Sequence, residues 1–414
     1  MKRSMVSMTI WVLIALGINS FYFINDTHAQ ASTQKNWVTF GVLCPTSGPI
    51  AGMGKYIVDT VNLAVEEVNT KWNPPDGGLI IKDKRYYVRY EYYDDGGDPS
   101  KSVAGFRKLV EMYKVPFVIG PFGTPQVLAT MPVSKELETF LTSFSSSDKA
   151  HRMGNPYMLA VRPPSKYYGA PLAKACIERG WKKFTVLTDV SDATTSTSEE
   201  FKKEMEKLGG ASLGFEIIDT KTVFDFRPMM TKFKAKNPDV IFVVAYQEPS
   251  AVMVNHAREV GYEGHILATA NYNQVSLKMA GLKNSSGILA ESMYWDYYLA
   301  HPEFDKTGSV TYLSNLYKRN YPSVPLADLI PTTWNPTLTF FKALEVAGTS
   351  TDTSAIQKSL DKAVKLIGNK LAIPYDGVLP SGMITGFDEL IIEIQPDGSF
   401  KKVGDLVIPV DKLR

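Results

Sequence analysis

Apolar segments of strand length alternate with amphipathic segments of helix length along most of this 414-residue chain. Near the start, the apolar segment 37–43 leads into apolar residues at helical spacing that end near Asn69. Further on, Val115–Ile119 is short and apolar throughout, as strands of a parallel sheet are. Because strands that alternate with helices usually pair in parallel, this pattern predicts a doubly wound α/β sheet.

The same alternation begins a second time after Arg162 and continues to Gly261. We therefore predict an α/β protein with two doubly wound lobes. A third stretch, 312–347 with 354–364, has helical spacing and too few strands for a sheet of its own. This stretch is therefore expected to pack onto one of the two lobes.

The N-terminus has the pattern of a secretory signal peptide. Two basic residues precede an apolar run, Met8–Ile18, and small residues follow at Ala29 and Ala31. We predict that residues 1–30 form the signal peptide, with cleavage after Ala29 or Ala31 and a mature chain in the periplasm. The alternative is a retained membrane anchor, for which the apolar stretch 8–24 is near the lower length limit of about 17 residues.

The charge balance argues against a polyanionic partner. The chain has 45 basic and 43 acidic residues, a formal net charge of +2, and no long run of one sign. Nucleic acids and anionic membranes are bound through a marked local excess of positive charge. We therefore predict a small-molecule ligand and no nucleic-acid partner.

Motifs for catalysis and for metal binding are weak or absent. The five histidines lack the spacing of a metal site, and no cofactor-binding motif is complete. Ser146-x-x-Lys149 with the later Lys306-Thr307-Gly308 resembles pieces of serine β-lactamases, but no Ser-Asp-Asn lies between them. We predict a protein without catalysis, cofactor or metal, and keep a hydrolase with Ser146 as its nucleophile as an alternative.

Two cysteines, Cys44 and Cys176, lie far apart in the chain. One ends a predicted strand and the other lies on the apolar face of a predicted helix. Two cysteines are too few for a disulfide framework. We predict buried free thiols, with a disulfide between the two as the alternative.

Candidate ligand-binding residues lie in loops that follow predicted strands. Ligands of open α/β sheets bind at the carboxyl ends of the strands. Hydroxyls and backbone N–H groups at a helix start suit a carboxylate, although the same Ser and Thr residues could simply cap helices. The loops are 44–49, 120–124, 142–147 and 246–249. Their candidates are Phe122, Gly123, Thr124, Phe144, Ser145, Ser146 and Tyr246.

Several segments together resemble one known family. They are, in chain order, Thr46–Gly54, Ala64–Asn69, Tyr93–Pro99, Lys108–Val110, Val118–Gly120, Phe224–Phe226, Pro238–Val240 and Ala280–Gly281. Their order and spacing over about residues 38–365 are similar to those of the periplasmic leucine/isoleucine/valine-binding proteins. Members of that family are the substrate-binding components of ABC importers of the branched-chain amino-acid type. The resemblance therefore implies a membrane permease complex as partner.

The resemblance also implies the type I periplasmic binding protein fold, in which three crossovers form a hinge between two lobes. Lobe one would comprise 36–162 and 295–370, and lobe two 163–294 and 371–414. A ligand that contacts both lobes favours the closed form. Family members are usually monomers. A sensor that passes its closed state to a membrane receptor is the main alternative to transport.

In the family, the carboxylate and the amino group of the ligand bind mainly to lobe one. The matching positions are Thr124, the backbone around Phe144, and Ser146. Tyr246 matches an aromatic residue of lobe two that closes over the ligand, and Met53 matches a position beside the side-chain pocket.

The sequence departs from the family pattern at informative positions. Amino-acid binders place an acidic residue on the ligand's ammonium, whereas the matching stretch 268–273 has no carboxylate, and Asn271 is our candidate there. Phe144 stands where a small residue is usual. With Phe122 and Tyr272 it could stack on a planar ligand or belong to the core. We therefore predict a carboxylate-bearing ligand, either aromatic or an amino acid.

Overall fold

The computed structural model describes residues 35–269, 272–372, 377–378, 384–385 and 388–407. The predicted signal peptide, residues 1–30, and the candidate Asn271 lie outside these residues. By its contacts, Asn36–Arg414 forms one unit. Within the described ranges, no helix combines the length and the apolar character that a bilayer crossing needs.

The first sheet is built from the N-terminal part of the chain. Its strands lie in the order β2-β3-β1-β4-β5-β6, and all neighbours pair in parallel except β2 and β3. The predicted strands 37–43 and 115–119 correspond to β1 and β4. The bounds are β1 Asn36–Leu43, β2 Leu79–Ile81, β3 Lys84–Tyr93, β4 Phe117–Ile119, β5 Phe140–Ser143 and β6 Met158–Ala160.

The second sheet joins the middle of the chain to its C-terminal part. Its order is β15-β14-β11-β10-β9-β7-β8; the strands β7 to β11 pair in parallel, whereas β14 and β15 pair antiparallel. The bounds are β7 Lys183–Asp189, β8 Ala211–Ile218, β9 Val240–Val244, β10 His265–Ala268, β11 Leu289–Met293, β14 Asp388–Ile394 and β15 Phe400–Val407. Two short strands, β12 Gly377–Val378 and β13 Ile384–Thr385, pair separately. The predicted α/β class is confirmed, although the sequence did not predict β14 and β15 as strands.

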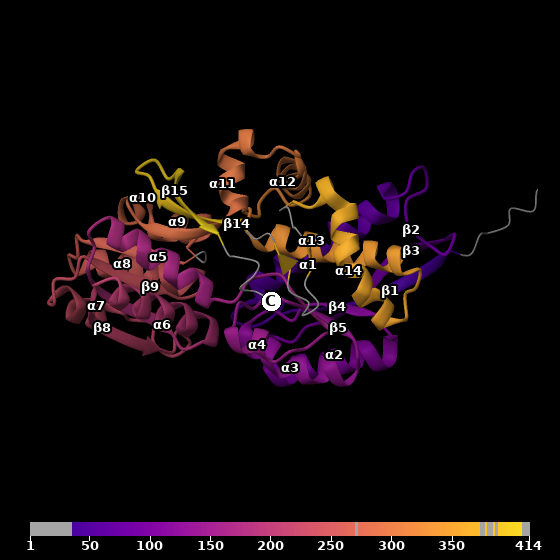
Figure 1. The fold of residues 1–414 in the computed structure, drawn as a ribbon, viewed down its shortest axis with the longest axis horizontal. Coiled ribbons are helices and arrows are strands. Elements are labelled where there is room, and N and C mark those ends of the chain that lie inside the picture. The colour runs from indigo at the N-terminus through magenta and orange to yellow at the C-terminus, as the bar shows by residue number, and fades with distance from the viewer. Residues whose placement is uncertain (1–34, 270–271, 373–376, 379–383, 386–387, 408–414) are drawn as a thin grey trace, which may run out of the picture. The chain divides into compact units, whose positions relative to one another are not determined.

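Helices cover both faces of the first sheet (Figure 1). One face packs against α1 Ala51–Lys71, α12 Ser309–Asn320, α13 Leu329–Ala347 and α14 Thr353–Ile367. The other face packs against α2 Pro99–Tyr113, α3 Thr124–Glu136 and α4 Asp148–Arg152. The rings of Phe117 and Phe340 stack with centroids 4.4 Å apart and join α13 to β4. The third helical stretch therefore packs onto the first sheet.

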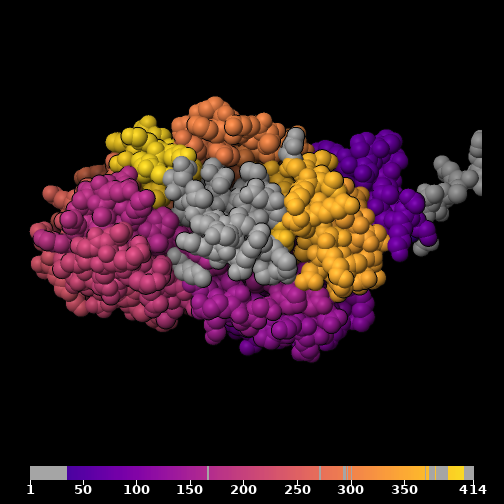
Figure 2. Space-filling view, in the orientation of Figure 1, coloured from indigo at the N-terminus to yellow at the C-terminus, as the bar shows by residue number. Residues whose placement is uncertain are grey.

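Helices also cover both faces of the second sheet. One face packs against α5 Lys166–Glu178 and α6 Asp192–Lys207, and the other against α7 Arg227–Lys234, α8 Gln247–Glu259 and α9 Gln274–Ala280. The yellow C-terminal strands lie beside the magenta residues of α5 (Figure 2), and α5 contacts β15 directly. The remaining helices are α10 Leu282–Ser285, α11 Tyr294–Ala300, η1 Pro302–Phe304 and η2 Gly368–Lys370.

Both cysteines are buried free thiols, as predicted. Burial raises the pKa of the Cys176 thiol to about 12. Burial, together with the carboxylates of Asp95 and Asp94, also raises the pKa of Cys44. Because the thiolate is the reactive form, neither cysteine is a nucleophile at neutral pH.

Candidate ligand-binding site

A cavity with about 60 Å³ of free space lies at the carboxyl ends of strands from both sheets. We call it the first cavity. It brings together seven of the residues that the sequence analysis proposed, from the loops after β4, β5 and β9. Its lining residues are Phe122, Gly123, Thr124, Phe144, Ser145, Ser146, Arg162, Ala193, Thr194 and Tyr246.

A second cavity, with about 40 Å³ of free space, adjoins the first. The two share Ser146, Arg162, Ala193 and Thr194. The other residues that line the second cavity are Tyr168, Thr197, Val244, Thr269 and Glu291. The sequence analysis assigned none of these five to a site.

The turn after β4 depends on glycine. Gly123 has a φ of 101°, in the left-handed region, and a Cβ there would lie 2.3 Å from Oε1 of Gln126. Gly123 is the N-cap of α3 and has no side chain to cap it, so Thr124 is the first residue of the helix and not its cap. The Thr124 hydroxyl instead lies 2.8 Å from that of Ser145, at the cavity wall.

Of the three serines that follow β5, one caps a helix and two line the cavities. Ser147 caps α4, since its Oγ accepts a hydrogen bond from the Ala150 N–H at 3.2 Å. Ser145 lines the cavity, and its Oγ accepts from the Ser147 N–H at 3.0 Å. Ser146 is half-buried and lines both cavities. The capping alternative therefore holds for Ser147, while the hydroxyls of Thr124 and Ser145 form a pair beside the free space.

Tyr246 connects the two walls of the first cavity. It follows β9, and its hydroxyl is hydrogen-bonded to those of Ser191, before α6, and Thr124, at the start of α3. Burial and the carboxylate of Asp189 raise the pKa of the Tyr246 phenol. The phenol therefore stays neutral near pH 7, where it can both donate and accept hydrogen bonds.

Of the other predicted site residues in the described ranges, some line a cavity and some lie only in the core. Phe122 and Phe144 line the first cavity with ring centroids 6.3 Å apart, and both also belong to the core of the first sheet. Tyr272 lines neither cavity; it is 2% exposed and its hydroxyl pairs with that of Ser285, so the core alternative holds for this ring. Met53 packs against the core of the first sheet and is not brought to either cavity.

Two charged side chains in the cavities were missed by the sequence analysis. Arg162 forms an ion pair with Asp328, with side chains only 15% and 12% exposed. Glu291, on β11, is 5% exposed and lines the second cavity. The stretch 268–273 has no carboxylate, whereas the next strand, β11, places one at the second cavity. A single acidic residue after the apolar run Ile288–Ala290 was the signal that could have found it.

The sequence pieces behind the serine hydrolase alternative are not brought together at the cavities. Of the described residues that line the two cavities, none is Lys or His. The Lys306-Thr307-Gly308 segment precedes α12, where the Thr307 and Ser309 hydroxyls lie 2.7 Å apart, and it lines neither cavity. In the part of the chain that the structure describes, no three His, Cys, Asp or Glu residues are grouped to hold a metal ion.

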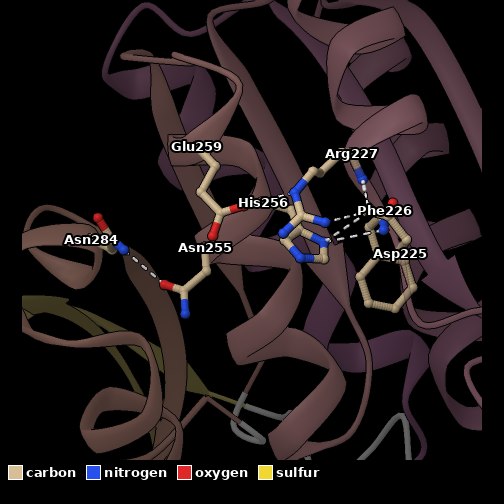
Figure 3. A network of polar contacts seen from close by, with 7 residues as sticks. All are labelled: Asp225, Phe226, Arg227, Asn255, His256, Glu259 and Asn284. Carbon is tan, nitrogen blue, oxygen red and sulfur yellow. Dashed lines mark hydrogen bonds and ion pairs between the residues drawn. The ribbon is translucent and has the colours of Figure 1, made fainter.

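A polar network on α7 and α8 has a structural role (Figure 3). His256 is 7% exposed, and its Nδ1 accepts a hydrogen bond from the Phe226 N–H at 3.1 Å. Arg227 binds the Glu259 carboxylate at 2.8 Å, which joins the same two helices at the surface. These residues lie outside both cavities.

Two α/β units whose strand ends line adjoining cavities define a two-lobed ligand-binding protein. The chain belongs to the periplasmic binding protein family, whose sequence profile matches residues 37–374. The Leu/Ile/Val-binding protein BraC3 of Rhizobium johnstonii is 21% identical over 284 residues, which cover 68% of this chain and 72% of that protein. The resemblance predicted from the sequence is therefore confirmed.

Solved structures show the same fold at low identity. The leucine-binding protein LivK of Thermotoga maritima superposes with a TM-score of 0.75 at 21% identity, covering 90% of this chain and 99% of that one. A solute-binding protein of R. palustris in complex with benzoate superposes with a TM-score of 0.73 at 15% identity, covering 90% and 97%. The fold is that of the type I periplasmic binding proteins.

Proposed function

We propose that this chain is the extracytoplasmic substrate-binding component of an ABC importer and captures an amino acid or another carboxylate-bearing small molecule. Lobe one comprises 36–162 with 295–370, and lobe two comprises 163–294 with 371–414. A ligand that contacts both lobes stabilises the closed form, which a membrane permease then recognises. The N-terminal segment directs export and is removed after Ala29 or Ala31, and the mature chain acts as a monomer.

The observation that carries this proposal is the set of hydrogen-bonded hydroxyls across the first cavity. Thr124 bonds Ser145 on one side and Tyr246 on the other. A carboxylate in this cavity would accept hydrogen bonds from such hydroxyls, each contributing about 1.5–3 kcal/mol. Two or three of them, with apolar contact to Phe122 and Phe144, are consistent with a dissociation constant near ~1 μM after ordering costs.

The comparisons support a carboxylate-bearing ligand and are compatible with both an amino acid and an aromatic acid. The related BraC3 is named for leucine, isoleucine and valine, whereas one structural neighbour holds benzoate. Both kinds of ligand carry a carboxylate. The side-chain group differs, and in this chain Phe122 and Phe144 are the rings that such a group would meet.

Thermal unfolding of the purified mature chain in the presence of amino acids, aromatic carboxylates and the matching amides tests the proposal. We expect carboxylates to raise the melting temperature and their amides to leave it unchanged. Small-angle scattering should then show a smaller radius of gyration with a stabilising compound. Stabilisation by uncharged amides alone would contradict carboxylate capture. N-terminal sequencing of the exported protein tests the cleavage position.

A further inference from the structure

The free space beside the hydroxyl pair of Thr124 and Ser145 is small. The first cavity holds about 60 Å³ and the adjoining second cavity about 40 Å³. For comparison, a buried apolar cavity of about 150 Å³ accommodates one benzene molecule. The two cavities do not reach that size even together. The space therefore suits a carboxylate with a short carbon chain and leaves no room for an aromatic ring attached to the carboxylate.

Two phenyl rings close one side of the first cavity. Phe144 is 4% exposed and Phe122 is 9% exposed, and both rings also pack in the core of the first sheet. Their centroids lie 6.3 Å apart, with the ring planes tilted by 49°. Because protein cores are close-packed, neither ring can move deeper into the core to enlarge the cavity. The two rings therefore fix the position of this wall.

Phe144 is next in the chain to the hydroxyls that would hold a carboxylate. It follows β5 directly and precedes Ser145, whose Oγ lies 2.8 Å from that of Thr124. All three residues line the first cavity. A ligand whose carboxylate meets the hydroxyl pair thus has its carbon chain confined to a space that the Phe144 ring bounds.

The second cavity is a poor place for an apolar chain. The residues that it does not share with the first cavity are mostly polar; they are Tyr168, Thr197, Val244, Thr269 and Glu291. An apolar chain would desolvate these polar groups without offering them hydrogen bonds, which is unfavourable. The length of an apolar chain is therefore limited in both directions, by the rings on one side and by the polar wall on the other.

We propose that Phe144 is a specificity-determining residue, whose ring together with that of Phe122 restricts the ligand to a short-chain carboxylate of about two to four carbons, with or without an amino group. This inference rests on the proposed function and narrows its ligand class. It excludes aromatic acids and long-chain amino acids as ligands of the wild type.

Two series of probes test the size limit by isothermal titration calorimetry of the mature chain. One series is acetate, propionate, butyrate, hexanoate and benzoate; the other is glycine, alanine, 2-aminobutyrate, leucine and phenylalanine. In at least one series, we expect affinity to rise about fourfold with each added carbon while the chain still fits. We then expect a fall of at least about tenfold from the best member to the last two, because they overfill the space.

Phe144→Leu and Phe144→Ala enlarge the first cavity by different amounts. We expect Phe144→Leu to shift the best ligand to a longer chain, and Phe144→Ala to bind benzoate or phenylalanine at least about tenfold more tightly than the wild type does. Phe144→Leu removes fewer buried carbons, so it keeps the test available if Phe144→Ala does not fold. The matched control is Phe140→Leu, a ring of β5 in the same core that lines neither cavity. It should keep the wild-type preference.

The outcomes separate the size limit from the proposed function. If the wild type binds hexanoate, benzoate, leucine or phenylalanine as tightly as the short members, the size limit is overturned and carboxylate capture stands. A chain-length preference that neither Phe144 variant changes, or that Phe140→Leu changes equally, overturns the role of Phe144. If no member of either series binds, the inference and the proposed function both fail.

Discussion

The Ser147 hydroxyl donates a hydrogen bond to the Asp192 carboxylate and thereby joins the start of α4 to the start of α6. The same carboxylate accepts from the Lys149 N–H at 3.4 Å. α4 packs with the first sheet and α6 with the second, so this contact joins the two proposed lobes beside the cavities. Asp192 also lies in the first turn of α6, where a negative charge is favourable.

Asp192→Asn should weaken ligand binding by favouring the open form. Loss of a charge-assisted contact between the lobes corresponds to about 1–2 kcal/mol, or roughly fivefold to thirtyfold in the dissociation constant. Titration calorimetry with a carboxylate that stabilises the wild type measures this change. Glu199→Gln, an exposed acid on the same helix, is the control and should bind normally. If Asp192→Asn bound the carboxylate as tightly as Glu199→Gln does, the Asp192 contact would have no effect on closure of the two lobes.

Tyr246→Phe should raise the dissociation constant about threefold to tenfold, because the hydroxyl that links Thr124 to Ser191 is removed at a cost of roughly 0.5–1.5 kcal/mol. Tyr272→Phe removes another buried hydroxyl, which bonds Ser285 outside both cavities. It should lower stability without changing affinity. Calorimetry and thermal unfolding of both variants separate the two effects, and a reversed pattern would place the ligand elsewhere.

Gly123→Ala should lower both stability and affinity. The new Cβ meets Oε1 of Gln126, and Gln126 cannot move away without losing its hydrogen bond to the Gly97 carbonyl. Together with the positive φ, this should cost about 1–3 kcal/mol of unfolding free energy. Gly154→Ala is the matched control, since its φ is +63° but no atom lies within 4 Å of the added Cβ. Urea unfolding should show a smaller loss there; equal losses would mean that strain alone, without the Gln126 clash, determines the effect.

The free energy of unfolding should decrease on acidification, because His256 takes up a proton. Burial, and then the Arg227 guanidinium, lowers the pKa of this imidazole from its ordinary value of 6.5. The folded state therefore binds protons less readily than the unfolded state, and the stabilising effect is complete above pH 6.5 and declines as pH falls toward the lowered pKa. Protonation also removes the acceptor for the Phe226 N–H (Figure 3), a bond of about 1 kcal/mol.

Urea unfolding at pH 7.5 and pH 5.0 measures this dependence. His256→Gln retains an acceptor that does not titrate, so its unfolding free energy should change less between the two pH values than that of the wild type. His301→Gln, at a half-buried histidine outside this network, is the control for the loss of a histidine as such. An unchanged pH dependence in His256→Gln would exclude His256 as the titrating group.

The sequence predicted the class of fold because α/β sheets have local signatures. The runs 37–43 and 115–119 became β1 and β4, in which Val38, Phe40–Leu43 and Phe117–Ile119 are buried, because strands covered on both faces are mostly apolar. It did not predict β14 and β15. β14 lies about a hundred residues beyond β11 in the chain and pairs with it antiparallel. Local periodicity does not encode a contact between segments so far apart in sequence.

The first cavity was largely predictable, since loops after parallel strands meet at one edge of a sheet and Thr124, Ser145 and Ser146 follow β4 and β5 directly. The sequence by itself also determined the small net charge, since the 45 basic and 43 acidic residues nearly balance. Only the tertiary structure decided which charges enter the site. Arg162 meets Asp328 from 166 residues away, and Glu291 reaches the second cavity because its strand is paired on both sides. Such placements depend on how distant segments pack, and packing is a property of the whole fold rather than of any local segment.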